Sequence, residues 1–204
     1  MKVSIIGTGN MARGIATRVL AGGNDVELVG RDRAAAEALA DELGATVGDE
    51  VSGEAVVLAV PYGAVADVVA AHGDALRGKV IVDITNPVDW STFDGLVTPS
   101  DSSAAEEIAK LLPEGTPVVK AFNTTFAPTL SAGQVAGQAL DVLLAGDDAD
   151  AKKTAASFVE AGGLRPLDVG PLKRARQLEQ LGFLHITAQE PLGAGFGSAI
   201  KLHW

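Results

Sequence analysis

Three small residues near the start of the chain have the spacing of a phosphate-binding turn. They read Gly7-x-Gly9-x-x-Ala12 in "KVSIIGTGNMARGIATRVL", directly after an apolar run and directly before a helical pattern. In such a turn the first glycine permits a tight bend, the second lets the backbone approach a pyrophosphate, and Ala can replace the third. The following helix offers free N–H groups and the positive end of its dipole. A plain strand-to-helix turn is the alternative. We expect a dinucleotide pyrophosphate at Gly7, Thr8, Gly9, Asn10 and Met11.

The residues after the next apolar run bear on which dinucleotide this turn would bind. An NAD site usually has Asp or Glu about 20 residues beyond the glycines, where it bonds the ribose 2′-OH. Here Gly30 stands at that place, and Arg31 and Arg33 follow. A guanidinium suits a 2′-phosphate through paired hydrogen bonds, which favours NADP(H). Two alternatives stay open: Asp32 could bond a 2′-OH, and Arg33 could be an ordinary solvated residue of the next helix.

Apolar runs and helical patterns alternate along the chain, and they must position these residues. This alternation indicates a parallel sheet with helices on both faces, and near-continuous apolar strands suit burial on both sides. We expect an α/β fold: a doubly wound, mostly parallel Rossmann sheet of about eight strands. A single domain over 1–204 is expected, including a small C-terminal helix and tail. Strands are predicted at 2–7, 25–30, 54–61, 79–87, 116–125, 139–148 and 164–170. Helices are predicted at 10–23, 34–44, 64–76, 103–112, 126–132, 148–161 and 172–189.

Two further segments lack a regular pattern. Residues 86–103 form a long polar stretch, and a loop of that length in a compact domain is often functional. Residues 193–204, "GAGFGSAIKLHW", are rich in glycine and end in apolar residues. A segment that only covers the core is one interpretation of this tail.

Composition excludes several kinds of function. The chain has 26 acidic and 16 basic residues, a net charge of −10, so it has no global footprint for nucleic acid or an anionic membrane. It contains no cysteine, which excludes a disulfide framework and a thiolate zinc site. No stretch approaches the roughly 18 apolar residues of a membrane helix, and no signal-peptide pattern is visible. We therefore expect a cytoplasmic protein.

Other titratable residues do not indicate a catalytic or metal site. The histidines are expected to be structural or solvated; they are His72, His185 and His203. An acidic cluster falls at a predicted helix start, where capping and the helix dipole explain it without a metal; it comprises Asp147, Asp148 and Asp150.

Several motifs occur together and in order, and the set resembles a known family. They are "IIGTGNMARGIATRVL", "VVLAVPYGAV", "VIVDITNPV", "SSAAEEIAKLLP", "VVKAFNT", "LLAGDD" and "GLRPLDVGPL". The set is similar to the NADP oxidoreductases dependent on coenzyme F420, an 8-hydroxy-5-deazaflavin, over nearly the whole chain. The reductase domain of the STEAP metalloreductases is similar too. The resemblance implies hydride transfer between nicotinamide C4 and deazaflavin C5 without a dedicated acid–base residue, and the sequence offers no convincing catalytic dyad.

The resemblance also implies where the two rings meet. It places them at the carboxyl edge of the sheet, where ligands of open α/β sheets bind. The residues that it places there are Val60, Pro61, Tyr62, Asn86, Pro87, Asn123, Thr124 and Thr125. Among these, Asn123 and Thr124 are expected to position the rings. Local turn bonding by the asparagines and strand termination by Pro87 are the alternatives.

One difference from the archaeal deazaflavin enzymes leaves the second ring open. Those enzymes have a His-Thr pair where this chain has Asn123-Thr124, and the Phe-Asn form is closer to the STEAP-like branch with its flavin acceptor. The expected cofactors are NADP(H) and coenzyme F420, with FMN or FAD as the alternative for the latter. An NADP(H)-sensing protein without turnover is another alternative. The resemblance suggests that the tail packs near the second cofactor or against a dimer partner, so a homodimer stays open.

Overall fold

Strands and helices alternate along the chain as the sequence pattern predicts. The computed structural model describes residues 1–204. The strands are β1 (Lys2–Ile6), β2 (Asp25–Val29), β3 (Thr46–Val47), β4 (Ala55–Leu58), β5 (Val80–Asp83), β6 (Val118–Lys120), β7 (Gln134–Val135), β8 (Gln138–Ala139), β9 (Asp141–Gly146) and β10 (Arg165–Asp168). The α-helices are α1 (Asn10–Ala21), α2 (Arg33–Leu43), α3 (Val65–His72), α4 (Ala104–Leu111), α5 (Ala127–Ala132), α6 (Ala149–Ala161), α7 (Ala175–Thr187) and α8 (Gln189–Leu192). Short 3-10 turns are η1 (Tyr62–Ala64), η2 (Gly73–Leu76) and η3 (Leu172–Arg174).

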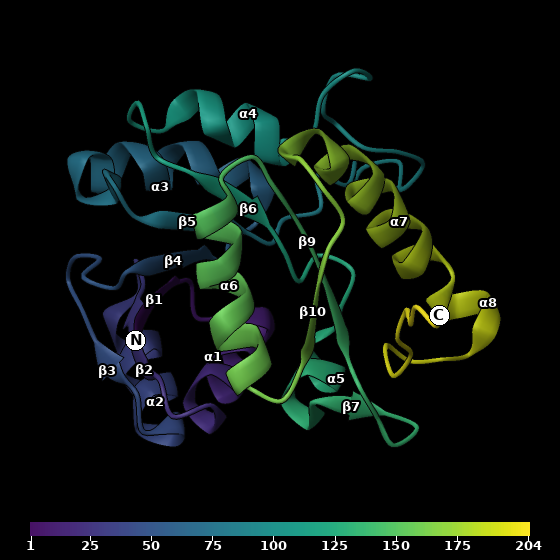
Figure 1. Cartoon of the computed structure of the whole chain (residues 1–204), viewed down its shortest axis with the longest axis horizontal. Helices are drawn as coiled ribbons and strands as arrows, with labels where there is room; N and C mark the ends of the chain where they lie inside the picture. The colour runs from purple at the N-terminus through teal and green to yellow at the C-terminus, as the bar shows by residue number, and fades with distance from the viewer.

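One eight-stranded sheet runs through the molecule, with helices on both faces (Figure 1). Its order is β10-β9-β6-β5-β4-β1-β2-β3. The neighbouring strands β6, β5, β4, β1, β2 and β3 are all parallel. By contrast, β9 pairs antiparallel with β6 and parallel with β10. The predicted doubly wound, mostly parallel α/β sheet is therefore confirmed.

Alternate side chains of the central strands enter two separate cores, because successive residues of a strand point to opposite faces. In β4, Ala55 and Val57 pack into a cluster that includes residues of α1, α5 and α6. Val56 and Leu58 point the other way, into a cluster with residues of α3 and α4. Both faces of β4 are therefore covered, which explains why its sequence is continuously apolar rather than alternating.

The structure differs from the sequence prediction mainly at strand ends and in short elements. The predicted strands 79–87 and 116–125 are shorter, because β5 and β6 leave the sheet after Asp83 and Lys120. The predicted helix 172–189 is divided into η3 and α7, and α8 continues to Leu192; the predicted helix 64–76 is divided into α3 and η2, preceded by η1. β3 and the β7–β8 hairpin were not predicted, since strands of two residues are too short to show a period.

A buried ion cluster joins the ends of β5 and β6 to two helices. The Lys120 side chain is fully buried, and its Nζ lies 2.8 Å from Asp83 Oδ2 and 2.8 Å from Glu179 Oε1. Nζ also donates a hydrogen bond to the Thr85 carbonyl oxygen. Glu179, on α7, accepts a hydrogen bond of 2.9 Å from the Ala104 N–H at the start of α4. The cluster thus fixes two strand ends and two helices relative to one another.

The charged states of Lys120 and Glu179 depend on one another. Burial alone would lower the pKa of Lys120, but attraction to Asp83 and Glu179 raises it above its ordinary value, so the ammonium stays charged. Burial raises the pKa of Glu179, and the ammonium opposes that shift. Removing the cation would therefore leave two carboxylates buried without compensation.

Replacement of this cation should destabilise the fold. We expect Lys120→Met to lower the free energy of unfolding by about 3–5 kcal/mol, as breaking a buried ion pair generally does. Urea denaturation followed by circular dichroism measures the change. The matched control is Lys110→Met, which removes an exposed lysine paired with Glu107 and should change stability little. Equal stability of the two variants would contradict the importance of the buried cluster.

Candidate functional site

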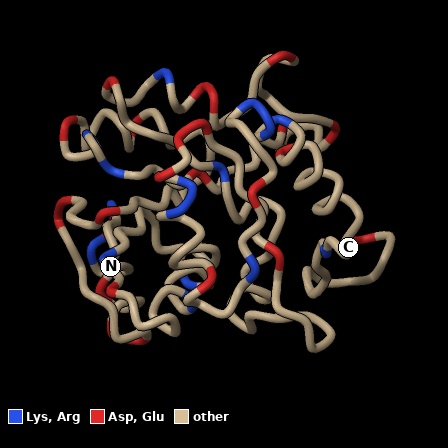
Figure 2. The backbone as a smooth tube through the Cα atoms, viewed as in Figure 1, with Lys and Arg blue, Asp and Glu red and all other residues tan.

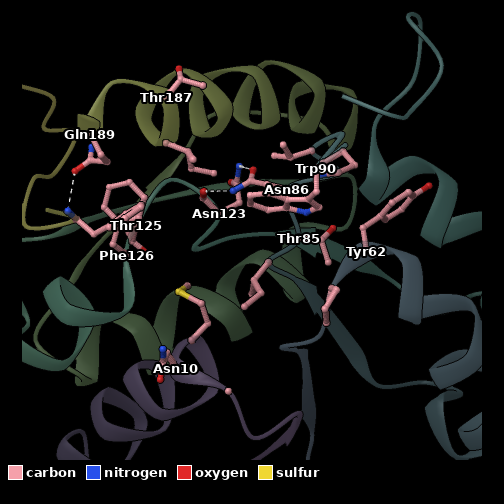
Figure 3. A pocket seen from close by; sticks show the side chains of 18 of the residues that line it. Asn10, Tyr62, Thr85, Asn86, Trp90, Asn123, Thr125, Phe126, Thr187 and Gln189 are labelled. Carbon is pink, nitrogen blue, oxygen red and sulfur yellow. Dashed lines mark hydrogen bonds between the residues drawn. The ribbon is translucent and has the colours of Figure 1, made fainter. Parts of the chain in front are cut away.

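A large cavity lies at the carboxyl ends of β1, β4, β5 and β6. It has a volume of about 1370 Å³ and is lined by 26 residues, of which Glu190 alone is an acidic or basic residue. In Figure 3, Asn10 lies across the cavity from Thr187 of α7. Tyr62 and Trp90 lie toward one end, and Phe126 and Gln189 toward the other. This is the sheet edge at which the sequence predicts the two rings.

The two glycines of the predicted phosphate turn have different surroundings. Gly7 has a φ of +125°, and a Cβ added there would lie 2.3 Å from the carbonyl oxygen of Ala59. Its N–H donates a 2.8 Å hydrogen bond to the carbonyl oxygen of Val29. Gly9 has an ordinary φ of −79°, lines the cavity, and has no atom within 4 Å of an added Cβ. The fold itself therefore requires Gly7, whereas the space beside Gly9 is open.

Gly9 is also the N-cap residue of α1, and it has no side chain with which to cap the helix. The first N–H groups of a helix have no partner within the helix, so they need a side chain, water or a ligand. In α2, α4 and α6 a side chain provides such a cap; the capping residues are Asp32, Ser103 and Asp148. At α1 no side chain does so, and Gly9, Asn10 and Met11 at its start line the cavity, so the positive end of the helix dipole lies at the cavity.

The end of β2 has little room for a side chain at position 30. A Cβ added to Gly30 would lie 2.9 Å from Cγ2 of Thr8, so a side chain there would require the Thr8 side chain to move. Asp32, which the sequence left as an alternative ribose ligand, accepts a 3.1 Å hydrogen bond from the Ala35 N–H and caps α2. Its carboxylate thus has a structural role in the protein.

The two candidate arginines differ in their partners. Arg33 forms ion pairs with Glu37, at 2.8 Å, and with Asp49, and these carboxylates raise its pKa further above its ordinary value. Arg31 is exposed, and no hydrogen bond or ion pair engages its guanidinium. Both lie outside the cavity lining. Arg31 is therefore the guanidinium that is available without breaking an ion pair.

An amide pair joins the segments that follow β5 and β6 (Figure 3). Asn86 Nδ2 donates to the Asn123 carbonyl oxygen at 2.7 Å, and Asn123 Nδ2 donates to Asn86 Oδ1 at 3.0 Å. Asn123 Nδ2 also donates to the carbonyl oxygen of Leu178 on α7, at 2.8 Å. Two buried oxygens on cavity-lining residues are left without partners: Asn123 Oδ1 and Thr85 Oγ1. Buried polar groups generally have partners, so these oxygens suit the polar edge of a ligand.

Tyr62, at the start of η1, adds a phenol to the cavity lining. Burial raises its pKa, and the nearby carboxylates of Glu107 and Glu179 raise it further. Its hydroxyl therefore stays protonated at neutral pH and can donate a hydrogen bond. No set of three or more His, Cys, Asp or Glu side chains is arranged to hold a metal ion.

The C-terminal tail, residues 193–204, is held against the cavity through His185. Nδ1 of this histidine lies 3.2 Å from the Thr124 carbonyl oxygen, and Nε2 lies 2.8 Å from Ser198 Oγ of the tail. Gln189 Nε2 donates to the same hydroxyl at 2.9 Å. Burial lowers the pKa of His185, which favours the neutral ring at physiological pH. His185 thus ties α7 to the segment after β6 and to the tail.

Aromatic packing and a second ion cluster complete the attachment of the tail. The Phe126 ring lies 4.3 Å from the His185 ring and 5.0 Å, edge-on, from Phe196 of the tail. Further along the tail, Leu202 N donates to Asp141 Oδ2 at 2.8 Å, and Lys201 Nζ lies 2.7 Å from Asp141 Oδ1. The first residues of the tail therefore form one wall of the cavity, which Gly193, Gly195 and Phe196 line.

Most of the residues that the sequence predicts for the cofactor site line this cavity. Those that line it are Gly9, Asn10, Met11, Val60, Pro61, Tyr62, Asn86, Pro87, Asn123 and Thr125. Those outside its lining are Gly7, Thr8, Arg31, Arg33 and Thr124. Further lining residues, which the sequence pattern did not indicate, lie on the loop after β5, on α7 and α8, and at Thr85 and Phe126. The irregular stretch 86–103 and the glycine-rich tail were the available signals, but neither identified individual side chains.

The fold and the site define a nucleotide-binding oxidoreductase of the Rossmann type, and the comparisons identify its family. A family model described as "NADP oxidoreductase coenzyme F420-dependent" matches residues 2–87. The F420-dependent NADP reductase of Methanothermobacter thermautotrophicus is 34% identical over 201 residues, which cover 89% of this chain and 86% of that protein. The chain belongs to the family of F420-dependent NADP oxidoreductases.

Two other comparisons agree with this fold. A crystal structure from Arthrobacter sp. FB24, provisionally assigned as an F420-dependent NADP reductase, has a TM-score of 0.87, 28% identity and full coverage of both chains. Metalloreductase STEAP3 of Rattus norvegicus is 34% identical over 182 residues, but these cover 88% of this chain and only 36% of STEAP3. This chain therefore spans about a third of that relative's length. No helix of the present chain has the length and apolar character needed to cross a membrane.

The different surroundings of the two glycines lead to a test of the phosphate turn. Gly9→Val should weaken NADPH binding by more than about tenfold, since the added side chain fills the space where backbone and pyrophosphate would meet. Its thermal midpoint should change little, because an added Cβ contacts nothing in the protein. Titration calorimetry and thermal unfolding measure the two effects.

Gly7→Val is the contrasting variant. Its Cβ would overlap the Ala59 carbonyl at an unfavourable φ, so the thermal midpoint should fall. Unchanged NADPH affinity in the folded Gly9→Val protein would contradict the placement of the pyrophosphate.

Proposed function

We propose that this protein catalyses hydride transfer between NADP(H) and the deazaflavin coenzyme F420. In the reductive direction, the hydride leaves nicotinamide C4 with its electron pair and forms a bond to deazaflavin C5. A proton from solvent completes the reduced ring, so NADPH, F420 and a proton give NADP⁺ and reduced F420. Membership of the family and the form of the cavity support this function.

The size and lining of the cavity are the observations that carry the proposal. Pockets for a single small ligand usually measure about 300–1000 Å³. The volume of about 1370 Å³ leaves room for a nicotinamide and a second ring system face to face. Hydride transfer needs the reacting carbons about 3–3.5 Å apart and a water-free site, but no acid–base pair. A lining with one carboxylate, Glu190, suits that requirement.

The residues of the chain have separable roles in this reaction. The uncapped start of α1 binds the pyrophosphate, and Arg31 binds the 2′-phosphate in the exposed region beyond β2. The unpartnered oxygens of Thr85 and Asn123 supply polar contacts at the ring end. Thr124 acts indirectly, since its carbonyl holds His185 and hence the tail.

A second candidate is an NADPH-dependent flavin or ferric reductase. It is favoured by the 34% identity to STEAP3 and by the Phe122-Asn123 pair that follows β6. The two candidates share the nicotinamide site and differ only in the acceptor.

Stopped-flow reduction with NADPH distinguishes these candidates. Coenzyme F420, FMN and FAD should be compared at equal concentrations under identical conditions. We expect F420 to be reduced fastest, as seen in the loss of its absorbance near 420 nm. Fast reduction of the flavins with none of F420 would transfer the assignment to the flavin reductase. NADPH binding without reduction of any acceptor would favour an NADP(H)-sensing protein.

The different partners of the two arginines lead to a prediction about cofactor choice. Arg31→Ala should weaken NADPH binding about tenfold or more, because charge-assisted contacts to the 2′-phosphate are lost. Arg33→Ala should have a smaller effect, since Arg33 already pairs with Glu37 and Asp49. NADH, which lacks the 2′-phosphate, is the control ligand and should respond little to either change. Calorimetric affinities that fall equally for NADPH and NADH would show that Arg31 does not contact the phosphate.

A further inference from the structure

The loop of residues 88–97, which we call the aromatic loop, is tightly ordered by its own hydrogen bonds. An isolated β-bridge joins Val88 to Leu96 at its base. Asp89 Oδ1 accepts hydrogen bonds from Ser91 N, at 2.9 Å, and Ser91 Oγ, at 2.6 Å. The Asp89 N–H donates to the carbonyl oxygen of Gly95 at 2.9 Å. Exposed side chains of this loop are therefore held by a defined backbone.

Two aromatic side chains of this loop line the cavity although they are exposed. Trp90 is 69% exposed and Phe93 42% exposed. Their ring centroids lie 5.7 Å apart, and the Phe93 ring is braced edge-on by Phe183 of α7 at 6.0 Å. Phe93 also has a φ of 54°, in the left-handed region that a bulky residue rarely adopts. A strained, braced phenylalanine thus supports a tryptophan whose indole remains largely uncovered.

The position of the aromatic loop restricts what this indole can contact. The loop follows β5, and Trp90 lies near Asn86 and Tyr62, across the cavity from Asn10 at the start of α1 (Figure 3). The pyrophosphate end of the cavity is therefore away from Trp90. At the other end, Phe196 already packs against Phe126, so its ring is engaged within the protein. Trp90 is the large aromatic side chain of the cavity with the most free surface.

We infer that Trp90 is a specificity-determining residue that stacks on the ring system of the hydride acceptor at the cavity mouth. This inference rests on the proposed function and adds the residue that selects the acceptor. A planar tricyclic ring has two faces, and one of them must meet the nicotinamide. The other face would be exposed to water at the open side of the cavity unless an aromatic side chain covers it. An indole covers such a face with little loss of conformational entropy and without a hydrogen-bonding requirement.

The test compares Michaelis constants for both cofactors in Trp90→Leu and Trp90→Phe proteins. Loss of aromatic stacking should raise the KM for coenzyme F420 about tenfold, as loss of stacking on a nucleobase does. The KM for NADPH should stay within about twofold, and Trp90→Phe should restore most of the F420 affinity. Binding of oxidised F420 without NADPH, followed by quenching of its fluorescence, should weaken in parallel in Trp90→Leu.

Trp204→Leu is the matched control for loss of an exposed tryptophan. Trp204 is 89% exposed, does not line the cavity, and packs under the Arg165 guanidinium at 4.7 Å. This variant should keep wild-type KM values for both cofactors. A similar rise in the F420 KM in Trp204→Leu would overturn the specific role of Trp90.

The remaining outcomes separate this inference from the function on which it rests. Absence of F420 reduction by the wild-type protein would overturn the proposed function and this inference with it. Normal wild-type reduction with an unchanged F420 KM in Trp90→Leu would overturn only the inference. A change in molar mass on light scattering for Trp90→Leu, with both KM values unchanged, would also overturn it and assign Trp90 to an interface between copies of the chain.

Discussion

The buried Lys120 ammonium is the constraint on which the carboxyl edge of the sheet depends. It contacts the carboxylates of Asp83 and Glu179 and the carbonyl oxygen of Thr85, so it joins β5, β6 and α7 at one point. Well-packed apolar residues are often as stabilising as a buried ion cluster. An apolar contact is not directional, however, whereas these hydrogen bonds fix the angle at which both strands leave the sheet. We therefore assign to the cluster a geometric role at the cavity as well as an energetic one.

The ring end of the cavity is built outward from that cluster. Thr85 and Asn86 lie two and three residues beyond Asp83, and Asn123 lies three residues beyond Lys120. The amide pair of Asn86 and Asn123 is bonded to α7, and α7 comes close because it has Gly182 at this point. A Cβ at Gly182 would lie 2.6 Å from Asn86 Oδ1. The same helix then carries His185, which holds the tail as the far wall. Each layer of the site thus depends on the one nearer the sheet.

The sequence was sufficient to predict the parts of the molecule that depend on local spacing. The period of the apolar residues predicted the sheet and its covering helices, and the glycine spacing predicted the turn before α1. The ion cluster could not be predicted in this way, because Lys120 and Glu179 are brought together only by tertiary packing. Glu179 lies on an amphipathic helix, where an acidic residue is normally assigned to the solvent face. Trp90 was missed for a similar reason: a long polar loop has no period from which to infer where a side chain points.

The distribution of charge around the cavity agrees with binding of the cofactor phosphates at one end and of the reacting rings at the other. The C-terminal half of α7, from Gly182 to Thr187, has no Lys, Arg, Asp or Glu (Figure 2). The free guanidinium of Arg31 lies instead beyond β2, outside the cavity lining. In a chain with a net charge of −10, general attraction does not favour an anionic cofactor, so recognition of its phosphates must be local. Arg31 and the start of α1 can provide it at the exposed end. The rings then bind in a region with few charged side chains to retain water, and hydride transfer requires a site from which water is excluded.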